Sequence, residues 1–152
     1  MTSEEEVRRD AVRRLEGAFS TLIGEFRRIY AGMAATASPG MLPGTFKVLS
    51  VIERRGPVTA SWLAEHLAAD KGQVSRHITE LESLGFVTRT PDPDDGRIRL
   101  ISVTGVGSER LTAAREPYEQ RLHEVLAGWP IESIDRLVEL LGALTSGDAP
   151  ES

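Results

Sequence analysis

The chain reads TASWLAEHLAADKGQVSRHITELESLG over residues 59–85, and this stretch contains two short apolar-periodic segments with a tight turn between them. Thr59 and Asp70 stand where these segments begin, and both are residue types that cap helix N-termini. FVTRTPDPDDGRIRLISV (86–103) follows, with strand-like ends and a turn-forming middle. Two helices joined by a tight turn and followed by a hairpin predict a winged helix-turn-helix, which places one helix in a DNA groove.

The second helix of this pair is expected to bury one face and to expose the other. Its inward stripe follows steps of four, three and three residues, and Gly85 supplies the left-handed residue after its end. The stripe consists of Val74, Ile78, Leu81 and Leu84.

Helices are expected on both sides of this region, so the predicted class is mainly α with a small β-wing. Apolar residues recur at helical spacing, with Pro, Gly or cap residues at the boundaries. The expected flanking helices span about residues 4–35, 43–55, 104–127 and 132–145. Residues 1–152 then form a single domain, with a DNA-reading region at 45–103 and helical dimerisation regions at 4–35 and 104–146.

The apolar stripes of the terminal helices favour a homodimer. Leaving them in water costs about 25 cal/mol per Å² of apolar surface, and packing against a second copy removes that cost. A two-fold dimer also matches a palindromic DNA site.

Charge is unevenly distributed along the chain. Residues 45–103 hold eight Lys/Arg and eight Asp/Glu, and residues 1–44 are also balanced. The net charge of −5 therefore resides in residues 104–152, which hold four basic and nine acidic residues. This balance permits DNA binding by the reading region without giving positive support to it.

Composition excludes several kinds of site. The chain has no cysteine, so disulfides, thiolate metal sites and thiol redox sensing are ruled out.

The N-terminal residues lack the apolar run of a secretory signal, and Gly and Pro interrupt the longest uncharged window. We expect a cytoplasmic protein with no cofactor, no metal and no membrane association. No arrangement of nucleophile and base supports an enzyme.

The outward face of the second helix carries the candidate DNA contacts. Arg binds guanine O6 and N7 bidentately, Gln binds adenine N6 and N7, and Lys and Ser suit phosphate or base contacts. At the hairpin tip, Arg97 is the candidate for the minor groove, with Asp95 expected to hold its guanidinium extended. The candidates are Lys71, Gln73, Ser75, Arg76 and His77 on the helix, and Asp95, Arg97 and Arg99 on the hairpin.

Local alternatives exist for four of these candidates. Gln73 also fits a capping box with Asp70, and Arg76 also fits an ion pair with Glu80 one turn on. His77 also suits a solvated position or a phosphate neighbour. Arg99 also fits an exposed strand position without a partner.

The stretch LAEHLAADKGQVSRHITELESLGFVTRTPDPDDGRIRLISVTGVG (63–107) resembles the core of the MarR (multiple antibiotic resistance regulator) family of bacterial transcription regulators. The resemblance implies interlocked terminal helices, a homodimer on a palindromic operator and repression. It also implies that the positions of Gln73, Ser75 and Arg76 face the major groove and that of Arg97 the minor groove. Two positions depart from the family pattern, since a small hydroxyl residue is common at Gly72 and a second Arg at Gly96.

Many regulators of this family release DNA when a small, often aromatic compound binds between the dimerisation helices and the reading region. The resemblance therefore implies a possible aromatic effector, for which plain core packing is the alternative role of the same side chains. The candidate lining residues are Tyr30, Met41, Trp62 and Trp129. A winged-helix protein-interaction module that does not bind DNA is the alternative function.

Overall fold

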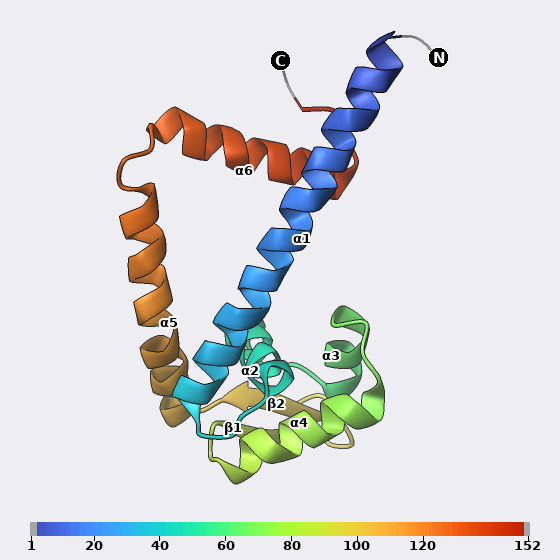
Figure 1. Cartoon of the computed structure of the whole chain (residues 1–152). Coiled ribbons are helices and arrows are strands. Elements are labelled where there is room, and N and C mark those ends of the chain that lie inside the picture. Colours follow the sequence, from blue (N-terminus) through green and yellow to red (C-terminus); the bar gives the residue numbers. More distant parts are fainter. Residues whose placement is uncertain (1–2, 151–152) are drawn as a thin grey trace. The chain divides into compact units, whose positions relative to one another are not determined.

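The computed structural model describes residues 3–150, which form six helices and one two-stranded sheet (Figure 1). This architecture confirms the predicted fold class. The elements in chain order are α1 (Ser3–Ala37), α2 (Pro43–Arg55), α3 (Ala60–His66), α4 (Lys71–Ser83), β1 (Val87–Pro91), β2 (Arg99–Val103), α5 (Gly105–Leu126) and α6 (Ile131–Ser146).

The chain divides into two compact units between Arg115 and Glu116. The first unit holds α1 to α4, the hairpin and the first half of α5, and the second holds the rest of α5 with α6. The division falls just before Pro117, which lies inside α5 and removes one hydrogen bond from its ladder. All candidate DNA contacts belong to the first unit.

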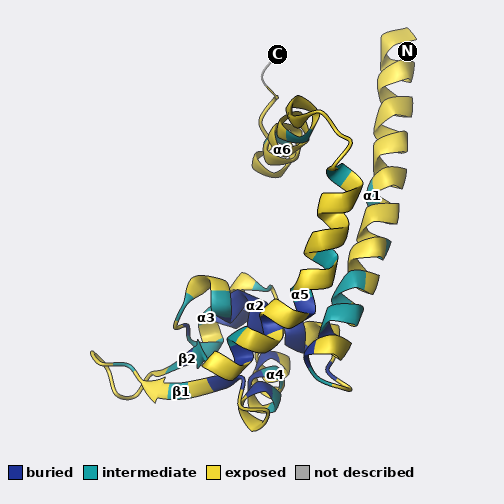
Figure 2. Cartoon of the chain, turned by 90° about the vertical axis from the view of Figure 1, so that its left-hand side faces the viewer, coloured by how far each residue is buried: buried dark blue, intermediate teal, exposed yellow. Residues whose placement is uncertain are grey.

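The core of the first unit gathers around α2. Figure 2 shows the buried residues concentrated in α2 and in the parts of α3, α4, α5 and the hairpin around it. Pro43 begins α2, and Gly56, with a φ of +80°, ends it after a nearly continuous buried run from Thr45 to Ile52. The largest buried side chains include Phe46, Leu49, Ile52, Leu63, Ile78, Leu81, Ile101 and Leu111.

The hairpin is antiparallel, with Val87 opposite Val103 and Pro91 opposite Arg99. Asp92 stabilises the turn through its Oδ1, which accepts the backbone N–H groups of Asp94 at 2.8 Å and Asp95 at 3.4 Å. The turn therefore includes Arg97, and the second strand begins two residues later at Arg99.

Two local features differ from the sequence expectation. Leu84 is 37% exposed, because α4 ends at Ser83 and Gly85, with a φ of +73°, then redirects the chain. Its predicted place in the inward stripe is therefore wrong. Val58 pairs with Ile101 through backbone hydrogen bonds of 3.1 and 2.8 Å, which adds a bridge to the hairpin that the sequence pattern did not reveal.

None of the helices within residues 3–150 combines the length and apolarity needed to traverse a bilayer.

The junction between the hairpin and α5 depends on Thr104 and Gly107. Thr104 Oγ1 donates to the Gly85 carbonyl at 2.6 Å and accepts the Gly107 N–H at 3.1 Å, so Thr104 caps α5. A Cβ at Gly107 would lie 2.2 Å from the Phe86 carbonyl oxygen. Only glycine therefore lets α5 approach the start of the hairpin this closely.

Replacing Gly107 by Ala should destabilise the fold by about 1–3 kcal/mol, because the new methyl group must push Phe86 and α5 apart. Urea unfolding followed by circular dichroism measures the change. Gly105→Ala is the matched control, since nothing lies within 4 Å of a Cβ at that position of the same helix. Equal stability of the two variants would contradict the close-approach argument.

Candidate nucleic-acid interface

The first turns of α4 present an exposed polar face above a buried apolar one. Asp70 caps the helix, and its Oδ1 accepts the Gln73 backbone N–H at 3.0 Å. Val74 and Ile78 are buried beneath the helix. The exposed side chains on its outer face are those of Lys71, Gln73, Ser75 and Arg76.

Of the two hydrogen bonds that a capping box between Asp70 and Gln73 requires, one is present among the described residues. The backbone N–H of Gln73 is bound by Asp70, but its side chain is exposed and has no hydrogen bond to another residue in the described range. The Gln73 amide therefore remains available for an external partner.

The predicted alternative pairing of Arg76 with Glu80 is absent within residues 3–150. Glu80 Oε2 instead accepts a hydrogen bond from the buried Thr45 hydroxyl at 2.8 Å. Arg76 is exposed, and no hydrogen bond or ion pair joins it to any residue of that range. Its guanidinium therefore faces solvent.

His77 differs from the outward set in which the sequence placed it. The residue is half-buried, and its Nδ1 lies 2.8 Å from the Thr45 hydroxyl of α2. Its ring also lies close to Gly44, where a Cβ would come within 3.1 Å of Nε2. His77 thus points toward α2, away from the polar face formed by Lys71, Ser75 and Arg76.

The tip of the hairpin exposes Arg97, but its predicted support by Asp95 is wrong. Asp95 Oδ1 accepts the backbone N–H of Arg97 at 3.0 Å and forms no ion pair with the guanidinium among the described residues. An aspartate carboxylate readily accepts the backbone N–H two residues further along the chain, and Asp95 binds the backbone of Arg97 in this way. Arg99 lies within β2 as an exposed strand residue, which agrees with its alternative role.

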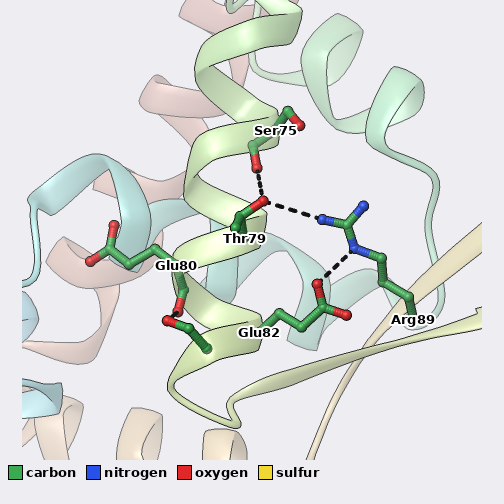
Figure 3. Close-up of polar contacts among 6 residues, drawn as sticks. Ser75, Thr79, Glu80, Glu82 and Arg89 are labelled. Atoms are coloured by element: carbon green, nitrogen blue, oxygen red, sulfur yellow. Dashed lines mark hydrogen bonds and ion pairs between the residues drawn. The ribbon is translucent and has the colours of Figure 1, made fainter.

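Arg89 is a contributor that the sequence reasoning missed. Figure 3 shows Arg89 reaching from β1 to α4, where its Nε lies 3.1 Å from Glu82 Oε2 and its Nη2 donates to Thr79 Oγ1 at 3.5 Å. Alternation along the strand supplied a signal, because Arg89 shares a face with the buried Val87. These contacts join the base of the hairpin to the exposed side of α4.

The four side chains expected around an effector do not line one cavity within either unit. Met41 is buried in the core, and Tyr30 packs edge-on against Phe46 with ring centroids 6.0 Å apart. Trp62 stacks on His66 at 4.6 Å and lines a separate hollow. Trp129 lines a hollow in the second unit.

Tyr30 lines a hollow of about 530 Å³ between α1 and α2. Its walls combine apolar and aromatic side chains with two cations, and it lies wholly within the first unit. The other lining residues are Ile23, Phe26, Arg27, Pro43, Gly44 and Lys47. No group of three or more His, Cys, Asp or Glu side chains within residues 3–150 is placed to hold a metal ion.

Comparison with known proteins places this geometry among transcription regulators. A family model described as the MarR family matches residues 40–98. The uncharacterized HTH-type transcriptional regulator YdgJ of Bacillus subtilis is 28% identical over 113 residues, covering 74% of this chain and 69% of that protein. The uncharacterized HTH-type transcriptional regulator Mb0904 of Mycobacterium bovis is 37% identical over 79 residues, covering 52% of this chain and 55% of that protein.

Solved structures show the same fold at low sequence identity. The MarR family transcription regulator SP03579 superposes with a TM-score of 0.81 at 19% identity, covering 95% of this chain and 94% of that one. Streptococcus pneumoniae FabT, whose structure is a complex with DNA, gives a TM-score of 0.75 at 18% identity, covering 89% and 95%.

Proposed function

The chain belongs to the MarR family of transcription regulators, and from this premise we propose that it binds specific DNA sites with α4 in the major groove. The relatives described above are HTH-type transcriptional regulators, and FabT was solved in complex with DNA. The observation that carries the proposal is the state of the outer face of α4. Four of its exposed side chains have no hydrogen bond or ion pair to another described residue, namely Lys71, Gln73, Ser75 and Arg76.

The contact set we propose is narrower on α4 than the one expected from the sequence. Gln73 and Arg76 are assigned to base edges, Lys71 and Ser75 to phosphate or bases, and Arg97 to the minor groove. His77 is left out because it is bound to Thr45. Asp95 supports the hairpin backbone instead of a contact, and Arg99 adds positive charge along the strand.

We propose that the protein acts as a homodimer on a palindromic operator. The helix α6 has no buried residue, although Leu137, Leu141 and Leu144 recur along it at helical spacing. Likewise, α1 exposes Leu22 and Phe26. Unpaired apolar faces of this kind favour association with a second copy, and a two-fold dimer would present two copies of α4 to symmetric half-sites. Occupation of the operator would then exclude other proteins, so repression is the mode of action we propose.

We further propose that a small aromatic anion releases the repressor from DNA. The hollow between α1 and α2 supports this, because Phe26 and Tyr30 offer aromatic contacts while Arg27 and Lys47 offer positive charge. A ligand acts in this way only if it binds better to the conformation that does not fit the operator.

DNA binding is tested by footprinting on a duplex that the protein itself selects from a random-sequence library. We expect a protected palindrome and an affinity that falls steeply with salt, because phosphate contacts release counterions. A folded dimer that selects and protects no sequence at low salt would contradict the proposal and favour a protein-interaction module.

Arg76→Ala should cost about 1–3 kcal/mol of binding free energy and relax the preference at one base pair of each half-site. Selection with this variant measures the lost preference. Arg97→Ala is the matched comparison, since it removes the same charge from the hairpin and should lower affinity mainly at sites with A·T-rich flanks. Equal loss on every sequence in the Arg76 variant would make Arg76 a phosphate contact only.

The effector proposal predicts that benzoate-type acids raise the melting temperature and weaken DNA binding at the same concentrations. Thermal shift and fluorescence anisotropy measure the two effects. Lys47→Met should abolish both effects of the acid. The uncharged amide analogue of the acid should have neither effect on the wild-type protein. If the acid raises the melting temperature of Lys47→Met as much as that of the wild type, the acid binds outside the hollow between α1 and α2.

A further inference from the structure

Glu80 lies on α4 at a spacing from which its carboxylate could reach Arg76. The two residues are one helical turn apart on α4, the spacing at which Arg and a carboxylate attract each other. In the structure, Glu80 Oε2 is bound instead by the Thr45 hydroxyl at 2.8 Å. The carboxylate that competes for Arg76 is therefore held by α2.

One buried hydroxyl binds two side chains of α4. Thr45 is fully buried, with 0% exposure, and its Oγ1 lies 2.8 Å from both Glu80 Oε2 and His77 Nδ1. A carboxylate only accepts hydrogen bonds, so the single hydroxyl proton is donated to Glu80. The hydroxyl oxygen then accepts from His77, which assigns the proton of the neutral ring to Nδ1.

Gly44 leaves the space that this arrangement requires. A Cβ at Gly44 would lie 3.1 Å from His77 Nε2 and 3.2 Å from Cε1. The ring is therefore packed against the start of α2, beside the hydroxyl that it binds. His77 and Glu80 are three residues apart and lie on the same side of α4, so both can reach Thr45.

We propose that Thr45 is a positioning residue for DNA recognition, because its hydroxyl keeps Glu80 away from Arg76 and leaves that guanidinium free for DNA. This inference rests on the proposed function. Without the hydroxyl, Glu80 would turn to Arg76, and the ion pair would have to break before Arg76 could reach a base.

The test compares Thr45→Val with Thr45→Ser on the duplex that the wild-type protein selects from a random library. Thr45→Val should bind about twofold more weakly, the cost of breaking an ion pair one turn apart on a helix. Thr45→Ser keeps the hydroxyl and should bind as the wild type does. Urea unfolding of each variant establishes that the binding assay uses folded protein.

A second pair of variants separates this role from simple packing. Glu80→Gln has no charge with which to hold Arg76, so Thr45→Val should cause no further loss of affinity in that background. The loss should also vanish in an Arg76→Ala background. A loss that persists in both, or wild-type affinity in Thr45→Val itself, would overturn the inference while leaving DNA binding established.

Nuclear magnetic resonance tests the hydrogen bonds without DNA. Long-range ¹H–¹⁵N spectra of the neutral His77 ring should show the proton on Nδ1 in the wild type and in Thr45→Ser. A proton on Nε2 in the wild type would mean that Thr45 donates to His77 and leaves Glu80 unbound, which overturns the inference. Failure of the wild type to bind any duplex would instead refute the proposed function.

Discussion

Burial of one face of α4 is the constraint on which the rest of the interface depends. Val74, Ile78 and Leu81 are each at most 1% exposed and lie in the core that α2 and α3 share with α4. Burying an aliphatic side chain of this size is worth about 1.5–3 kcal/mol. Successive helical residues are 100° apart, so these three positions set the rotation of α4 about its axis. A rotation by one residue would bring Ser75 into the core and expose Val74.

Polar contacts then hold this orientation at three points along the helix. Asp70 binds the first turn, Thr45 binds the middle through two side chains, and Arg89 binds the far half from β1. The cap at Asp70 is worth about 1 kcal/mol, and the partly exposed ion pair of Arg89 with Glu82 about 0–1 kcal/mol, so each contributes less to stability than the buried apolar face. Their partners lie on the loop before α4, on α2 and on the hairpin. The position of α4 is thus tied to three separate parts of the reading region.

Features that depend on neighbours in sequence were predictable, and those that depend on distant partners were not. Periodicity and cap chemistry identified α4, the cap at Asp70 and the turn at Asp92, because the interacting groups lie within four residues. The orientation of His77 depends on Thr45, which is 32 residues away, and no local pattern specifies that contact. For Arg89, strand alternation indicated the face but not the carboxylate that it meets.

The region of residues 45–103 has no net charge, but most of its acidic side chains bind other groups of the protein, whereas most of its basic side chains form no ion pair with a described residue. Of its eight acidic side chains, six bind N–H, O–H or guanidinium groups of the protein: Glu53, Asp70, Glu80, Glu82, Asp92 and Asp95. Of its eight basic side chains, Arg89 alone forms an ion pair within the described residues. DNA affinity depends on cations that reach phosphates, so Lys71, Arg76 and Arg97 count for more than the regional sum. A neutral region can bind a polyanion when the fold occupies its carboxylates and leaves its cations to solvent.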